Sequence, residues 1–178
     1  MKKLKNSELN RISVDEFKTA IKTPFVLVLD NVRSLNNVGS AFRTSDAFRV
    51  EAIYLCGITG KPPSNEIHKT ALGAEDSVKW NYFPATLEAI RELKKNNYRI
   101  ISVEQAEGSV SLEKFKIEPD VKYALVFGNE VKGVDQNIVD ESDLCLEIPQ
   151  FGTKHSFNIS VSVGIVLWDL FKKYHFPE

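Results

Sequence analysis

Three short polar stretches of this chain carry the residue types that could do chemistry. They are "NNVGSAFRTSDAF" (residues 36–48), "FGNEVKGV" (127–134) and "IPQFGTKHSFN" (148–158). Each follows an apolar run typical of a buried strand, and parallel sheets place their ligand sites at the carboxyl ends of strands. The candidate residues within these stretches are Asn37, Arg43, Glu130, Ser156 and Asn158.

Other catalytic and binding motifs are missing. No GxGxxG follows the first apolar run, no GxxxxGK[ST] occurs, and no GxSxG supports a nucleophilic serine. The three histidines, at positions 68, 155 and 175, are too scattered for a zinc site. Hydride transfer, nucleotide hydrolysis and acyl transfer therefore lose support.

Taken one at a time, the polar residues also have purely structural explanations. A short amide or hydroxyl can cap a helix, an arginine can pair with a carboxylate one turn away, and glycine permits a turn. These alternatives are helix caps at Asn37, Ser156 and Asn158, an Arg43–Asp46 ion pair, and turns at Gly128 and Gly133.

Apolar runs alternating with helical stretches predict one α/β domain. The runs "FVLVLD", "EAIYLC", "YRIISV", "YALVFG" and "LCLEI" are continuous, as in parallel strands covered by helices on both faces. We expect a mostly parallel sheet flanked by helices at about 38–48, 85–96 and 135–141. Ser13 and Glu16 form a capping box at the start of an earlier helix, and the Gly- and Pro-rich segment 57–65 is the expected loop.

The last helix has two apolar stripes. Its sequence "FNISVSVGIVLWDLFKKYHF" indicates one face that packs on the sheet and a second face that favours a homodimer, although a deeply buried core helix remains the alternative. The small residues Ser160, Ser162 and Gly164 would let another backbone approach. The two stripes are Ile159, Val163, Val166 and Leu170, and Phe157, Val161, Ile165 and Trp168.

Composition places the chain among ordinary globular proteins. The formal net charge is -1, but six of the basic residues lie before residue 23, so a basic helical extension (1–23) precedes the main domain (24–178). No apolar run reaches the roughly 20 residues of a membrane span. Cys56 and Cys145 lie in apolar runs without metal-ligand spacing, which suggests reduced thiols and a cytoplasmic protein with no metal.

In this order, the three stretches resemble the three motifs of the SpoU family of RNA ribose 2'-O-methyltransferases, also called the TrmH family. The segment "TALGAEDSVKWNYF" (70–83) resembles that family's middle region. The resemblance covers about residues 24–172. It implies a deep C-terminal trefoil knot around 128–134 and 148–158, formed with the last helix, and S-adenosylmethionine as the methyl donor.

The resemblance also implies roles for particular residues. Asn37, Arg43, Glu130, Ser156 and Asn158 match the family's catalytic positions. Because a guanidinium stays protonated, we expect Arg43 to bind RNA phosphate and stabilise the developing alkoxide rather than to act as the base. Cofactor contacts would come from the neighbourhood of Leu125, Phe127, Gly128, Ile148, Gln150 and Phe157.

The substrate expected from the resemblance is tRNA, at a guanosine, since "YRIISVEQAEGSVSLEKF" is similar to segments of tRNA-modifying members. Ribosomal RNA, methylation of a base, and a catalytically silent RNA-binding dimer remain alternatives. Two positions depart from the family pattern. Phe157 replaces a leucine and so alters the shape expected of the cofactor pocket, and Arg49 stands where glycine is frequent.

Overall fold

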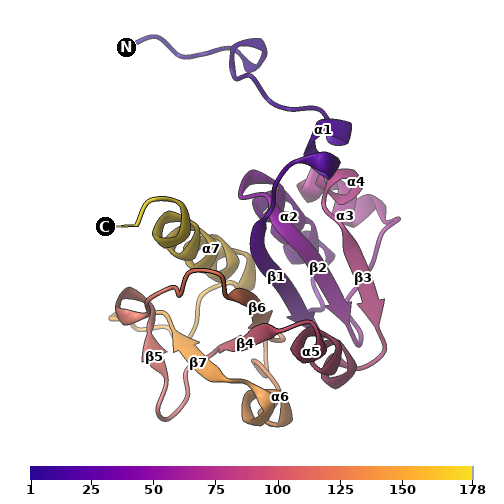
Figure 1. Ribbon diagram of the computed structural model, residues 1–178. Coiled ribbons are helices and arrows are strands. Elements are labelled where there is room, and N and C mark those ends of the chain that lie inside the picture. The colour runs from indigo at the N-terminus through magenta and orange to yellow at the C-terminus, as the bar shows by residue number, and fades with distance from the viewer. Residues whose placement is uncertain (178) are drawn as a thin grey trace.

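The computed structural model describes residues 1–177, apart from the side chain of Asn6, and is built on a seven-stranded sheet (Figure 1). The strand order is β3-β2-β1-β6-β4-β7-β5, and every neighbouring pair is parallel, which confirms the predicted sheet type. The strands are β1 (Thr23–Asp30), β2 (Val50–Cys56), β3 (Trp80–Phe83), β4 (Tyr98–Val103), β5 (Val110–Ser111), β6 (Lys122–Phe127) and β7 (Leu144–Glu147).

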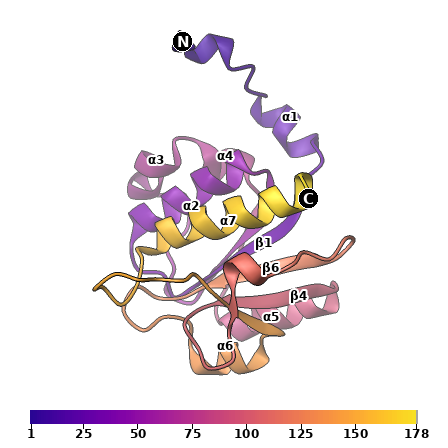
Figure 2. The ribbon, with the colours of Figure 1, turned by 90° about the vertical axis from the view of Figure 1, so that its left-hand side faces the viewer.

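Helices cover both faces of the sheet (Figure 2). Side chains alternate along the central strand β1: Leu27 and Leu29 enter one apolar cluster with Phe42, while Val26 and Val28 enter the other. Helices α2 (Leu35–Ala47), α3 (Asn65–Ala71), α4 (Ala74–Ser77) and α7 (Ile159–His175) lie on the first face, and α5 (Thr86–Lys95) and α6 (Gln136–Glu141) on the second.

The N-terminal segment extends away from the sheet in both views (Figures 1 and 2). It holds a short 3-10 helix, η1 (Asn6–Glu8), and helix α1 (Val14–Thr19). The predicted capping box is present, since the Ser13 side chain accepts from the Glu16 N–H and the Glu16 side chain accepts from the Ser13 N–H. Phe17, which is 3% exposed, packs α1 against the body; the boundary between extension and domain at residue 23 stays a prediction.

Helix α2 begins earlier than the sequence suggested. Ser34, not Asn37, is the cap residue, and its Oγ accepts from the Asn37 N–H at 3.3 Å. Asn37 therefore lies in the first helical turn, and its side-chain amide is free to bond elsewhere. The structure also adds the edge strands β3 and β5 and the helices α3 and α4. These elements are short, and β3 and β5 are only half buried, so they lack the continuous apolar runs of the inner strands.

A buried carboxylate at the end of one strand forms hydrogen bonds to the segments that begin two helices. Asp30, at the end of β1, is 1% exposed. Its Oδ1 accepts from Thr86 Oγ1 at 2.6 Å and Asn31 Nδ2 at 2.9 Å, and its Oδ2 accepts from the Asp135 N–H at 3.2 Å. Because Thr86 begins α5 and Asp135 precedes α6, one side chain fixes where both helices start relative to the sheet.

The two stripes of α7 differ in burial. The first stripe packs inward on the sheet and α2, with every member at most 9% exposed. On the second stripe Val161 is 47% and Trp168 53% exposed, so this face is only partly covered by the residues that the structure describes. No helix among residues 1–177 is long and apolar enough to cross a membrane. The knot implied by the resemblance stays a prediction.

Candidate functional site

Two of the three polar stretches line a cavity of about 1120 Å³ at the carboxyl ends of β4, β6 and β7, and the first stretch is joined to it by the hydrogen bonds of Asn37. Its walls come from residues 103–107 and 127–134, from parts of α6 and of 148–158, and from the start of α7. Eight of the residues singled out in the sequence line it: Phe127, Gly128, Glu130, Ile148, Gln150, Ser156, Phe157 and Asn158.

Glu130 is the hub of this site. Its Oε1 accepts from the Ser34 N–H at 2.9 Å and from Asn37 Nδ2 at 3.0 Å, and its Oε2 accepts from the Arg33 N–H at 3.0 Å. Burial raises the pKa of Glu130, but these hydrogen bonds outweigh burial and hold the pKa below its ordinary value. The side chain is therefore an ionised carboxylate that fastens the loop after β6 to the start of α2.

Asn158 continues the hydrogen-bonded chain from Glu130 and Asn37. Its Nδ2 donates to Asn37 Oδ1 at 3.2 Å, while its Oδ1 accepts from the Ser160 N–H at 2.9 Å and thereby caps α7. Asn158 therefore both caps α7 and bonds to the side chain of Asn37 in the first stretch. The chain Glu130–Asn37–Asn158, called the amide–carboxylate chain below, joins one residue from each of the three stretches.

The loop that carries Glu130 is tightly folded on itself. Asn129 and Gly133 exchange two backbone hydrogen bonds of 2.9 Å, and Gly133 has a φ of +70°. A Cβ on Gly128 would lie 2.0 Å from the Gly133 carbonyl carbon, so only glycine allows this approach. Asn129 Nδ2 also donates to the Asn31 carbonyl at 2.8 Å, which ties the loop to the end of β1.

Two residues that the sequence reading passed over hold the cavity walls together. Glu104 Oε2 accepts from the Val134 N–H at 3.0 Å, and Gln105 Nε2 donates to the His155 carbonyl at 2.7 Å. Both residues line the cavity and directly follow β4. The rule that polar residues after parallel strands form sites applies to "YRIISVEQ" as well, so this signal was available in the sequence.

Leu125 lies apart from the cavity. It is fully buried in β6 and its backbone pairs with β1 and β4 on either side. Its side chain belongs to the apolar core, and the expected backbone contact with a cofactor near Leu125 stays a prediction.

Arg43 is also separate from the amide–carboxylate chain. It is exposed on α2 and makes no hydrogen bond or ion pair within residues 1–177. Six residues of helix place it about 120° around the axis from Asn37, so the two side chains do not converge. The alternative pairing with Asp46 is not formed either, because Asp46 Oδ1 accepts from Ser77 Oγ at 2.6 Å.

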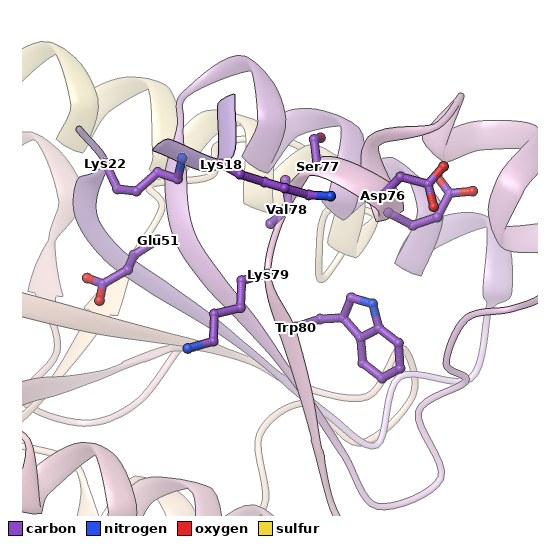
Figure 3. A pocket seen from close by; sticks show the side chains of 9 residues that line it. Lys18, Lys22, Glu51, Asp76, Ser77, Val78, Lys79 and Trp80 are labelled. Carbon is purple, nitrogen blue, oxygen red and sulfur yellow. The ribbon is translucent and has the colours of Figure 1, made fainter. Parts of the chain in front are cut away.

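A second hollow, of about 550 Å³, lies near the amino ends of β2 and β3 (Figure 3). Basic and acidic side chains both line it, and Trp80 forms part of its wall. It contains none of the candidate residues: it is lined by Lys18, Lys22, Glu51, Glu75, Asp76, Ser77, Val78, Lys79 and Trp80. The large cavity at the carboxyl ends is therefore the candidate functional site.

Residues 24–168 match the model of the SpoU rRNA Methylase family, which covers most of the chain and includes all three stretches. This chain belongs to the SpoU family. The segment before the match is the basic extension that carries α1. The resemblance of the three motifs is thereby confirmed at the level of the family.

Individual SpoU relatives show the same agreement. The chain is 31% identical over 153 residues, 86% of its length, to the 23S rRNA (guanosine-2'-O-)-methyltransferase RlmB of Neisseria meningitidis. It superimposes with a TM-score of 0.80 and 26% identity on an AdoMet-bound rRNA methyltransferase from Sinorhizobium meliloti, covering 89% of this chain and 59% of that one. For the TrmH/SpoU tRNA modifying enzyme of A. aeolicus the TM-score is 0.79 at 25% identity, covering 90% and 80%.

The SpoU chain spans only part of several relatives. It covers 60% of the length of the Neisseria protein and 59% of a Staphylococcus aureus protein assigned to the TrmH family of tRNA/rRNA methyltransferases.

The lowered pKa of Glu130 predicts a pH-dependent contribution to folding stability. Because the pKa is lower in the folded than in the unfolded chain, the stabilisation is complete above about pH 5 and is lost as the pH falls below about 4. Glu130→Gln removes it. We expect the gap in unfolding free energy between wild type and variant to be constant near neutrality and to shrink towards pH 3, as measured by urea denaturation.

Glu107→Gln is the matched control, because Glu107 lines the same cavity but accepts no hydrogen bond within the described structure. It should stay within about 0.5 kcal/mol of wild type. A stability gap for Glu130→Gln that is the same at pH 3 and pH 7 would contradict the role given to this carboxylate.

Proposed function

We propose that this SpoU protein transfers a methyl group from S-adenosylmethionine to a ribose 2'-hydroxyl of RNA. The amide–carboxylate chain carries the proposal, because it assembles one residue from each family motif at the edge of a large cavity. The RNA-methylating relatives support the same reaction.

The cavity has the chemistry to hold S-adenosylmethionine, which supplies an activated methyl group when bound. Apolar side chains form one part of its wall, and carboxylates form another. A sulfonium and an ammonium group are cations, so the carboxylates favour them over an uncharged ligand. The apolar residues include Phe127, Val134, Ile148 and Phe157, and the carboxylates are Glu104, Glu107, Glu130 and Asp140.

The geometry limits what Glu130 can do in the reaction. Its two oxygens already accept three hydrogen bonds, so it positions Asn37 and the loop rather than taking a proton from the substrate. The Ser156 hydroxyl lines the cavity and makes no hydrogen bond among the described residues, which leaves it free for a ligand. These positions favour alignment of the reacting groups as the main contribution of the site.

Arg43 supplies the positive charge in this proposal. It is exposed and free of partners within the described chain, so it can bind an RNA phosphate next to the target ribose without first breaking an ion pair. A guanidinium there would stabilise the oxyanion that develops on the 2'-oxygen.

We propose tRNA, methylated at a guanosine, as the substrate, and a cytoplasmic location. The basic N-terminal segment supports a substrate recognised partly through phosphates. Ribosomal RNA is the second candidate, favoured by the 31% identity to the Neisseria rRNA enzyme.

Methyl transfer from labelled S-adenosylmethionine to unmodified tRNA and rRNA, followed by nucleoside analysis, tests the reaction. We expect 2'-O-methylguanosine in tRNA, and a loss of about 100-fold or more in rate for Arg43→Ala with cofactor affinity unchanged. Arg91→Ala, on the exposed side of α5, controls for the loss of an arginine. A methylated base would assign a different reaction, and full activity of Arg43→Ala would refute the role of that residue.

We also propose that the protein is a homodimer that buries the outer stripe of α7. Val161 and Trp168 expose an apolar surface, and Phe48 and Phe171 continue it through ring contacts. A Cβ on Gly164 would meet no atom within 4 Å, so the helix can be approached closely there. An apolar helix face of this kind is stable in water only when it is covered.

Trp168→Glu should therefore yield a monomer, because a charge would be buried in the interface without a partner. Light scattering after size-exclusion chromatography measures the mass. Ile58→Glu is the control, since Ile58 is 67% exposed in a loop away from α7. A wild-type mass of one chain, or an intact dimer in Trp168→Glu, would contradict the proposal.

A further inference from the structure

The rim of the large cavity displays a fully exposed aromatic ring. Phe151 is 98% exposed, and it sits between two residues that line the cavity, Gln150 and His155. A single exposed apolar residue is common on protein surfaces. Here, however, the facing loop also exposes Val131, at 79%, and Phe157 is 41% exposed on the same loop as Phe151.

The loop that carries Phe151 is held in place beside the cavity. Gln105 Nε2 donates to the carbonyl of His155 at 2.7 Å, and Asn158 fastens the end of the loop to Asn37. At the other end, Ile148 packs against the main apolar core. The ring of Phe151 is therefore presented to solvent from an anchored loop and not from a free chain end.

Cations accompany the exposed apolar side chains. Lys132 lines the cavity next to Val131, and Lys154 follows Phe151 by three residues. Neither lysine forms an ion pair in the part of the chain that the structure describes. Protein–protein interface cores are depleted in lysine, whereas aromatic rings beside basic groups are what unpaired nucleotides need, a stacking surface for the base and a partner for the phosphate.

We propose that Phe151 stacks on an unpaired nucleobase of the substrate RNA next to the target nucleotide, with Lys132 and Lys154 on the adjoining phosphates. This inference rests on the proposed function and names how that site recognises its substrate. It requires the RNA around the target ribose to be single-stranded, as in a loop, because a stacked and paired base has no free face to offer.

Two substitutions of Phe151 separate stacking from simple apolar contact. Phe151→Leu keeps an apolar side chain but removes the ring, and Phe151→Trp enlarges the ring. Loss of one base–aromatic stack corresponds to roughly a fivefold to 150-fold loss of affinity. We expect Phe151→Leu to weaken RNA binding by at least about fivefold and Phe151→Trp to bind like wild type or more tightly, with cofactor affinity unchanged in both.

The experiment measures RNA affinity at fixed salt by anisotropy, cofactor affinity by calorimetry, and the oligomeric state of each variant. Phe176→Leu is the matched control, because Phe176 is 65% exposed beyond the end of α7. RNA affinity of Phe151→Leu equal to that of wild type would overturn the inference. So would dissociation of Phe151→Leu into monomers, which would mean that a second copy of the chain covers the ring.

The lysines give an independent test. Replacing Lys132 and Lys154 by glutamine should make the negative slope of log affinity against log salt less steep, by about one per lysine. Lys95→Gln, at the end of α5, should leave that slope unchanged. An unaltered slope would refute the phosphate contacts. If the wild-type protein methylates no RNA, the proposed function fails. If the Phe151 and lysine variants bind and methylate RNA like wild type, only this inference is refuted.

Discussion

The arrangement of the site depends on one ionised side chain, Glu130. Its carboxylate satisfies the backbone N–H groups of Arg33 and Ser34 where the chain enters α2, and it holds the amide of Asn37 at the same time. These three hydrogen bonds from one carboxylate join the loop after β6 to the start of α2. Asn158 extends the constraint to α7. Three segments far apart in the chain are thus joined by side-chain hydrogen bonds.

Carboxylates also hold the loops at the ends of the neighbouring strands. Asp30 fixes the starts of α5 and α6, and Glu104 holds the backbone at Val134, each through a carboxylate that accepts N–H or O–H groups from other elements. A parallel sheet brings its carboxyl ends together but leaves the loops there without backbone partners. Acidic side chains after the strands supply those partners, and the cavity is the space that the fastened loops enclose.

Much of the scaffold could be predicted from the sequence because it follows local rules. Continuous apolar runs identified the five inner strands, and the Ser13–Glu16 pair identified the first helix. The predicted start of α2 was wrong because Ser34 and Asn37 are both good cap residues. Only the hydrogen bond from Asn37 to Glu130, which is distant in sequence, decides between them. The half-buried edge strand β3 has no comparable signal.

The site was predictable in its members but not in its connections. The three stretches indicated Glu130, Asn37 and Asn158, yet which atom bonds to which depends on how distant loops pack, and no local pattern encodes that. Gln105 shows the limit, since its role rests on a bond to the backbone of His155, fifty residues away. Arg43 shows another, because it is exposed on α2 and has no partner among residues 1–177, so its role stays a prediction.

The central claim is that Glu130 and Asn37 act as one unit, and a double-mutant cycle on single-turnover methyl transfer tests it most directly. Asn37→Ala, Glu130→Gln and the double variant would be compared at saturating cofactor. If the two residues work through their shared hydrogen bond, the double variant is no slower than the slower single variant. Rate losses that multiply in the double variant would show independent roles and contradict the account.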